Sequence, residues 1–248
     1  MEFGKVNNKL INTYKMSKKE STPLYEEENF DNCYYGCSCD NDCCDENCYY
    51  DNNCNDCGCN DCCDYEEDFE EDLDYQNAEI GELAPDFYLD GYFKGEIQQY
   101  SLSQFEGKWT VLFFYPLDFT FVCPTELLEL SKRHKEFEKI NTQILGISVD
   151  SVYAHKAWSK ELGDLNFPLI SDFNKDTSFE YNVLHNDGMS LRGTFIIDPE
   201  GIVRSYTVND LNIGRNIDEI IRTIQALETG ELCQVGWKPG EKTLGKAE

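Results

Sequence analysis

The sequence has few basic residues. Its 248 residues contain 21 Lys and Arg against 48 Asp and Glu, which gives a formal net charge of −27. No Lys or Arg occurs from Glu20 through Phe93. Because binding to phosphate groups needs a basic surface, this composition argues against nucleic acid or an anionic membrane surface as a partner. The acidic excess is typical of a very soluble protein.

Long apolar segments and targeting signals are also lacking. No run of about 18 apolar residues occurs, so we expect no transmembrane helix. The first residues, MEFGKVNNKLINTYKMSKKES, are mildly basic but contain neither an apolar core nor a small-residue cleavage site. The sequence therefore predicts a cytoplasmic location.

Cysteine is scarce outside one segment. Eleven of the 13 cysteines lie between Cys33 and Cys63, and the rest of the chain contains only Cys123 and Cys233. A fold stapled by disulfides would not leave its larger part with two cysteines 110 residues apart. This distribution favours a functional pair of cysteines over a framework of structural disulfides.

The cysteine-rich tract, residues 31–75, consists mainly of Cys, Asp, Asn, Tyr and Glu. With almost no aliphatic residues it cannot form a packed core. Cys54 to Cys57 and Cys59 to Cys62 have the two-residue gap of zinc knuckles, although so many cysteines produce such gaps by composition alone. Metal binding, auxiliary thiol or disulfide chemistry and a disordered tail all remain open. We expect an extension over residues 1–77 and a globular domain over 78–248.

The globular part alternates between apolar runs typical of strands and amphipathic segments typical of helices. The predicted strands are Trp109–Tyr115, Gln143–Val149, Leu169–Ile170, Gly193–Ile197 and Gly201–Val208. The predicted helices are Pro124–Ile140, Ser151–Leu162 (capped by Asp150 or Ser151), Asp176–Tyr181 and a last one carrying Ile217 to Leu227. This order predicts a mixed α/β sheet with helices on both faces. Sites in such sheets lie beyond the carboxyl ends of the strands, so the loop after Tyr115 is the first candidate.

That loop contains Cys123 directly before a predicted helix, with Pro124 in the first helical position. Free N–H groups and the positive end of the helix dipole stabilise a thiolate, which is the reactive form of cysteine. A lone cysteine beside a strand is more often a small buried hydrophobe. The arrangement of Pro116, Thr120 and Cys123 ahead of a helix favours a nucleophile instead.

The segment Tyr115–Glu126 (YPLDFTFVCPTE) resembles the active-site motif of typical two-cysteine peroxiredoxins. The resemblance continues through LRGTFIID, VNDLNIGR and GELCQVGWKPG, and it spans residues 78–241. It implies a thioredoxin-like fold and a thiol-dependent peroxidase that reduces hydrogen peroxide and organic hydroperoxides.

The same resemblance assigns roles to individual residues. It implies that the Cys123 thiolate attacks the peroxide and becomes a sulfenic acid. Thr120 would place its hydroxyl on the sulfur and the peroxide oxygen, and Arg192 would stabilise the developing charge. Pro116 would shelter the sulfenic acid from water, and Glu126 would orient Arg192.

Cys233 matches the resolving cysteine, which the partner subunit of a head-to-tail homodimer contributes in this family. It would form an intersubunit disulfide with Cys123, and a thioredoxin-like or flavoprotein reductase would restore both thiols. The resemblance implies dimers paired at the final strand, with decamers common in the family, and no metal, haem or nucleotide cofactor.

The match has departures. Gln234 and Val235 stand where the family usually has Pro and Ala. The terminal helix and the Gly-Gly-Leu-Gly loop of oxidation-sensitive members are not found, since residues 158–168 read WSKELGDLNFP. We therefore expect Cys123 to resist overoxidation.

The sequence bears on two alternative functions. A disulfide reductase of the thioredoxin type needs a second cysteine about two residues from the first, and Cys123 has none. The tail is similar in composition to a cysteine-rich surface antigen of a protozoan parasite. This similarity suggests a metal-binding or surface-interaction protein acting through the tail, and a cell-surface location reached by an unconventional route.

Overall fold

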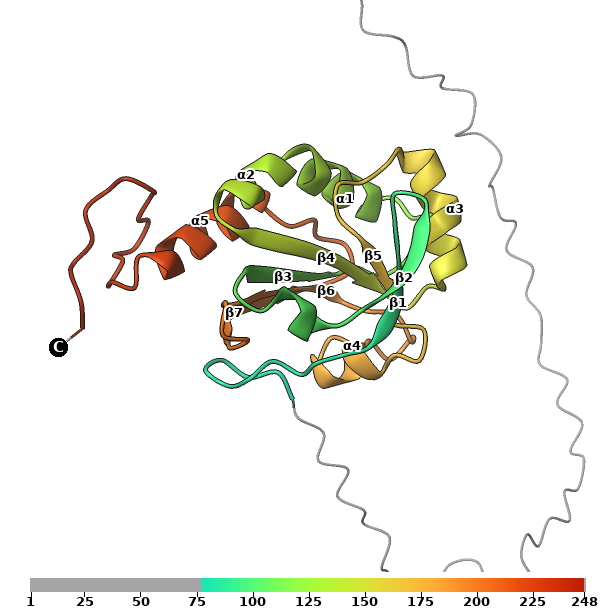
Figure 1. The fold of residues 1–248 in the computed structure, drawn as a ribbon, viewed down its shortest axis with the longest axis horizontal. Coiled ribbons are helices and arrows are strands. Elements are labelled where there is room, and N and C mark those ends of the chain that lie inside the picture. Colours follow the sequence, from blue (N-terminus) through green and yellow to red (C-terminus); the bar gives the residue numbers. More distant parts are fainter. Residues whose placement is uncertain (1–76, 248) are drawn as a thin grey trace, which may run out of the picture. The chain divides into compact units, whose positions relative to one another are not determined.

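The computed structural model describes residues 77–247, and the cysteine-rich tract lies outside them. The described residues contain a seven-stranded mixed sheet with the strand order β2-β1-β5-β4-β3-β6-β7 (Figure 1). The strands are β1 (Leu89–Phe93), β2 (Glu96–Tyr100), β3 (Trp109–Phe114), β4 (Thr142–Ser148), β5 (Leu169–Ser171), β6 (Arg192–Ile197) and β7 (Val203–Asn209). β3, β4 and β5 run parallel, and the other pairings are antiparallel.

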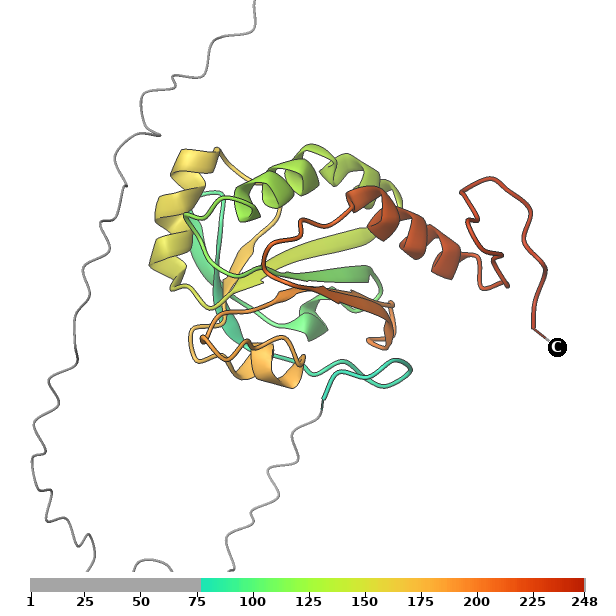
Figure 2. The same cartoon turned by 180° about the vertical axis from the view of Figure 1, so that it is seen from behind.

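Helices cover both faces of the sheet. They are α1 (Cys123–Lys132), α2 (His134–Lys139), α3 (Val152–Leu162), α4 (Asp176–Glu180) and α5 (Ile217–Glu228), with a short 3-10 helix at Leu102–Phe105. Figures 1 and 2 show α1, α2, α3 and α5 on one face and α4 on the other. The predicted α/β sheet with helices on both faces is confirmed. Within residues 77–247, no helix has the length and apolar character needed to cross a membrane.

The central strand β3 explains why its sequence is continuously apolar. Val111 and Phe113 pack into the core under α1, α3 and α5, whereas Leu112 and Phe114 pack into the core on the α4 face. All four side chains are fully buried. A strand covered on both faces cannot alternate between polar and apolar residues, so WTVLFF is the expected pattern.

The predicted helix over Pro124–Ile140 is wrong in one respect, because the structure divides it into α1 and α2 at Arg133. Arg133 has φ −94° and ψ 6°, which lies outside the helical region. Its guanidinium bonds to Glu136 of α2 and to Asp218 of α5. The break therefore lies where a side chain joins two helices.

The hairpin of β1 and β2 had no counterpart among the predicted elements. Asp90, Gly91 and Lys94 interrupt its apolar pattern, so the strand signal is weak. Pairing of β1 with β5 holds the hairpin to the sheet. A Cβ atom on Gly91 would lie 2.7 Å from side-chain atoms of both Ile170 and Tyr100, so the close packing of this strand needs glycine.

Candidate active site

The candidate site lies where β3 ends and α1 begins. Cys123 is the first residue of α1, Pro124 follows in the first turn, and the Cys123 side chain is fully buried as a free thiol. The positive end of the α1 dipole lies at this position, while the N–H groups of Thr125 and Glu126 donate to the Val122 carbonyl. The site therefore favours negative charge on the sulfur.

Arg192, the first residue of β6, brings a positive charge to the sulfur. Its Nη1 atom lies 3.5 Å from Cys123 Sγ and 2.7 Å from Glu126 Oε2. Its Nε atom donates to the carbonyl oxygen of Leu211 at 2.8 Å. These contacts fix the guanidinium plane, so the donor beside the sulfur is held in place before any substrate arrives.

Glu126 lies one turn into α1 and is buried between two arginines. Arg215 donates to Glu126 from its backbone N–H at 2.8 Å, from Nε at 2.9 Å and from Nη2 at 3.1 Å. Burial raises the pKa of Glu126, but the hydrogen bonds and charge of Arg215, together with the charge of Arg192, outweigh burial and lower it. Glu126 is therefore ionised and orients both guanidinium groups.

Arg215 was not among the predicted site residues. Its side chain is 3% exposed, its Cζ atom lies 3.2 Å from the centre of the Phe113 ring, and its Nη1 donates to the Gly193 carbonyl at 2.7 Å. Burial lowers the pKa of Arg215 to about 10, against the opposing effect of Glu126. The signal that could have found it is its place at the end of the VNDLNIGR block.

Two further predicted residues lie in the loop before Cys123. Pro116 is buried just after β3, and Thr120 is half-buried. The Thr120 hydroxyl donates to the Leu117 carbonyl at 2.9 Å. The proton of this hydroxyl is committed to Leu117, and the predicted role of Thr120 at the sulfur and the peroxide oxygen stays a prediction. Its oxygen lone pairs remain able to accept.

Cys233 lies apart from this cluster, in the segment after α5. Figure 1 shows that segment beyond the end of α5 and away from the sheet. Cys233 is a half-buried free thiol beside the carboxyl end of α5, 3.6 Å from Thr229 Oγ1 and 3.8 Å from the Ala226 carbonyl. Backbone bonds from Leu232 to Gly245 and from Leu244 to Leu232 fold this segment back on itself.

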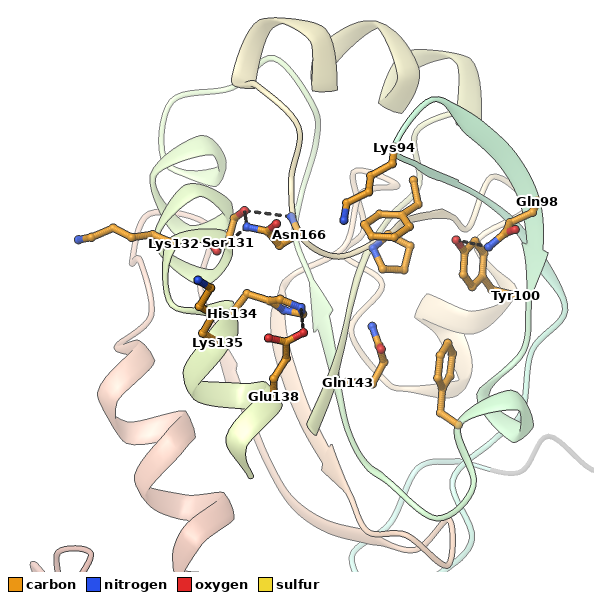
Figure 3. Close-up of a pocket in the computed structure, with 13 residues that line it drawn as sticks. Lys94, Gln98, Tyr100, Ser131, Lys132, His134, Lys135, Glu138, Gln143 and Asn166 are labelled. Carbon is orange, nitrogen blue, oxygen red and sulfur yellow. Dashed lines mark hydrogen bonds and ion pairs between the residues drawn. The ribbon is translucent and has the colours of Figure 1, made fainter. Parts of the chain in front are cut away.

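A separate cavity of about 650 Å³ opens between α2 and the β1–β2 hairpin. Figure 3 shows Lys94 and Tyr100 on one wall and His134 and Glu138 on the other. Neither a cysteine nor any of the predicted site residues lines it. The Cys123 cluster is therefore the better candidate for chemistry.

A buried, pre-oriented thiol at a helix start, with a guanidinium beside it, defines a thiol-based redox enzyme. The comparison with known families agrees, since residues 80–206 match the AhpC/TSA family model. The chain belongs to this family, the peroxiredoxins, and is a thiol-dependent peroxidase. Cys123 falls inside the matched residues and Cys233 outside them.

Individual relatives and structures support the same assignment. The chain is 54% identical over 177 residues to chloroplastic 2-Cys peroxiredoxin BAS1 of Spinacia oleracea, covering 66% of this chain and 67% of the relative. It is 49% identical over 179 residues to peroxiredoxin-2 of Mus musculus, covering 68% and 90%. The reduced 2-Cys peroxiredoxin of Plasmodium vivax superposes with a TM-score of 0.65 at 42% identity, covering 66% and 91%. These likenesses confirm the thioredoxin-like fold and do not support the alternative of a metal-binding or surface protein.

The predicted cytoplasmic location is contradicted. Four matched relatives, from Spinacia oleracea, Arabidopsis thaliana, Hordeum vulgare and Chattonella marina, are described as chloroplastic, which points to a plastid. The prediction rested on the absence of a recognisable targeting signal. Such an absence does not determine a compartment.

Proposed function

We propose that Cys123 is the residue that attacks the peroxide and that Cys233 of a partner subunit resolves the product. The observation that carries this proposal is the position of the Cys123 sulfur, fully buried at the start of α1 and 3.5 Å from Arg192 Nη1. A guanidinium beside the sulfur and a helix start both stabilise a thiolate.

The first step is a displacement at oxygen. The Cys123 thiolate attacks one peroxide oxygen, an S–O bond forms, and the O–O bond breaks. The leaving alkoxide or hydroxide takes a proton and departs as an alcohol or water, which leaves a sulfenic acid on Cys123. Sulfur loses two electrons and the peroxide gains them. Arg192 and the start of α1 stabilise the charge as it moves onto oxygen.

Three neighbours support that step. Thr120 accepts a hydrogen bond from the peroxide O–H, because its own proton is committed to Leu117. Pro116 is buried at the end of β3 and keeps water from the sulfur. Glu126 holds Arg192 in place through the 2.7 Å bond. Thr120 therefore positions the peroxide, Pro116 shields the sulfenic acid, and Glu126 acts through Arg192.

The second step joins two subunits. The Cys233 thiol attacks the sulfenic acid, an S–S bond forms, and water leaves. A thioredoxin-like or flavoprotein reductase then supplies two electrons to regenerate both thiols. We propose hydrogen peroxide and small alkyl hydroperoxides as substrates, and a homodimer paired at β7, one of the two edge strands of the described sheet. Five such dimers would form a decamer.

We further propose that residues 1–77 are a separate extension, similar in composition to a cysteine-rich surface antigen, and that residues 78–248 form the enzyme. The family match over residues 80–206 supports a boundary before residue 80. On this proposal the extension takes no part in the peroxidase steps.

The test compares wild type, Cys123→Ser and Cys233→Ser in peroxide turnover coupled to thioredoxin. We expect Cys123→Ser to be inactive. Cys233→Ser should complete one round of peroxide reduction and then fail to recycle. Wild type treated with one equivalent of peroxide should run as a dimer on a non-reducing gel, and neither variant should form that Cys123–Cys233 band. Turnover by Cys123→Ser would refute the proposal.

A further inference from the structure

A chain of buried polar groups lies under the loop that leads to Cys123. The Tyr115 hydroxyl donates to Asp118 Oδ1 at 2.8 Å, and His155 Nδ1 lies 2.8 Å from Asp118 Oδ2. The Asp118 and His155 side chains are both 0% exposed. None of these residues has a hydrogen bond to the sulfur in the described part of the chain, and none has a role in the steps proposed above. Burying such groups is costly unless they are fully paired, so the network needs an explanation.

His155 uses both ring nitrogens within the network. Its Nδ1 lies 2.8 Å from Asp118 Oδ2, and its Nε2 lies 3.2 Å from the Ile170 carbonyl oxygen. A carboxylate oxygen and a carbonyl oxygen are both acceptors for a ring N–H. The His155 ring therefore joins α3 to the loop on one side and to β5 on the other.

The network links the loop to two strands of the sheet and to one helix. The Asp118 N–H donates to Asp150 Oδ2 at 2.9 Å, and Ser148 at the end of β4 donates to the same atom at 2.7 Å. Ser171 at the end of β5 donates to the Asp150 carbonyl at 2.6 Å. The loop between β3 and α1 is therefore linked through Asp150 to the carboxyl ends of β4 and β5, and through His155 to α3.

The ionisable groups that face His155 and Asp118 are Tyr115 from the end of β3 and Asp150 from the turn before α3. Burial and the negative charge of Asp118 raise the pKa of Tyr115 well above its ordinary value. Burial and the same charge raise the pKa of Asp150. Tyr115 therefore stays a hydrogen-bond donor. The Trp158 ring packs on Tyr115 and on Phe119, which closes the network from the α3 side.

The position of Cys123 gives this network a consequence. Because the sulfur is fully buried, no sulfur from another subunit can reach it until the loop or the first turn of α1 moves. The closed loop suits peroxide attack, since it holds the thiol beside Arg192. The open loop suits disulfide formation. The bonds of Asp118 oppose opening.

We propose that Asp118 and His155 are positioning residues that hold the Cys123 loop closed and so set the balance between peroxide attack and disulfide formation. The kinetic part of this proposal rests on the proposed roles of Cys123 and Cys233. Weakening the network lowers the rate of attack and raises the rate of the disulfide step. A merely structural role would move both rates in the same direction.

Asp118→Ala and Asp118→Asn form a matched pair. Alanine leaves Tyr115 and His155 without their partner. Asparagine can accept from Tyr115 and donate to neutral His155 while Nε2 keeps its bond to Ile170, so every hydrogen bond is restored without a charge. Asp198→Ala is a control for lost stability, because Asp198 is an equally buried carboxylate in the turn between β6 and β7.

Rapid mixing of the full chain with hydrogen peroxide, followed by acid quench and mass spectrometry, separates sulfenic acid from disulfide. In Asp118→Ala we expect sulfenic acid formation to fall by about tenfold and disulfide formation to accelerate. Asp118→Asn should return both rates toward wild type, and Asp198→Ala should leave their ratio unchanged. Equal slowing of both steps in Asp118→Ala, or no change, would overturn the proposal.

Asp118 and His155, in holding the Cys123 loop closed, are here called the clamp. Hydrogen exchange of the reduced protein tests the clamp without any peroxide. Backbone amides of residues 117–123 should exchange faster in Asp118→Ala than in wild type or Asp118→Asn. If exchange is faster in Asp118→Ala but wild type forms no sulfenic acid at Cys123, the clamp stands and the proposed function is refuted. Exchange in Asp118→Ala equal to wild type would refute the clamp and leave the proposed function untouched. If Asp118→Ala fails to fold, Tyr115→Phe removes one bond and should give smaller shifts in the same directions.

Discussion

At the scale of single residues, the site depends on a carboxylate that serves two guanidinium groups. Glu126 accepts from Arg192 with one oxygen and from Arg215 with both. Only Arg192 also reaches the sulfur. The two arginines therefore differ in function although they share a partner. Arg192 acts on the reacting atoms, and Arg215 fixes Glu126 to β6 through the Gly193 carbonyl.

Arg192→Lys should slow the attack of Cys123 on peroxide. The planar guanidinium donates to Cys123, Glu126 and the Leu211 carbonyl at once. The lysine ammonium is a single compact group at the end of an unbranched stem and cannot reach all three. Loss of one such donor costs roughly 10²–10³ in rate. Quenched-flow measurement of sulfenic acid formation checks this, with Arg204→Lys on the exposed surface of β7 as the control. An attack rate equal to wild type would contradict it.

Glu126→Gln should lower stability most at neutral pH. The variant leaves two buried guanidinium groups without their carboxylate, which costs about 3–5 kcal/mol. In wild type the folded-state pKa of Glu126 lies below its ordinary value of 4.5, so the contribution is present above pH 4.5 and is lost as pH falls through the folded pKa.

Urea unfolding from pH 7 to pH 3 tests this pH dependence. The gap in unfolding free energy between wild type and Glu126→Gln should be largest at pH 7 and should narrow below pH 4.5. A gap that stays constant across this range would mean that folding does not lower the pKa of Glu126. The variant should also misplace Arg192, so its attack rate should fall at pH 7.

At the scale of elements, β6 places both Arg192 and the partner of Arg215, so its packing should matter to the site. A Cβ atom on Gly193 would lie 2.7 Å from Val183 Cγ1 and 3.1 Å from Phe195 Cε2. Both neighbours are buried and cannot move freely. Gly193→Ala should therefore lower the unfolding free energy by about 1–3 kcal/mol.

Gly214→Ala is the matched control for that variant. The nearest atom to its added Cβ is Val122 Cγ1 at 3.5 Å, which is an ordinary contact. Denaturant unfolding should therefore find Gly214→Ala within about 0.5 kcal/mol of wild type. Equal losses of unfolding free energy in the two variants would show that the close approach of Val183 to β6 does not cause the destabilisation of Gly193→Ala.

The elements also show what the sequence could and could not predict. Strand β3 was predictable because burial on both faces requires a continuous apolar run, which WTVLFF provides. The break at Arg133 and the β1–β2 hairpin depend on contacts with α5 and β5, which no local pattern contains. Cys123 was found from its loop, whereas the burial of Arg215 over Phe113 arises only when distant segments meet.

At the scale of the whole molecule, charge is divided unevenly between the proposed extension and the enzyme. Residues 1–77 contain 5 basic and 21 acidic residues, a net charge of −16, and residues 78–248 contain 16 and 27, a net charge of −11. Hydrogen peroxide is neutral, so this charge does not affect its encounter with Cys123. A charged reductase, by contrast, meets the summed field of both parts.

Deletion of residues 1–77 should therefore separate the two half-reactions. With dithiothreitol as a neutral reductant, kcat/KM for hydrogen peroxide should stay within about threefold of the full chain, because no charged partner is involved. With a reductase of net negative charge, the shortened chain should turn over faster at low ionic strength. The difference should vanish as salt shortens the range of the repulsion to about 3 Å at 1 M. Loss of peroxide activity with dithiothreitol would contradict the proposed boundary, since it would mean that the enzyme needs its extension to fold or to react.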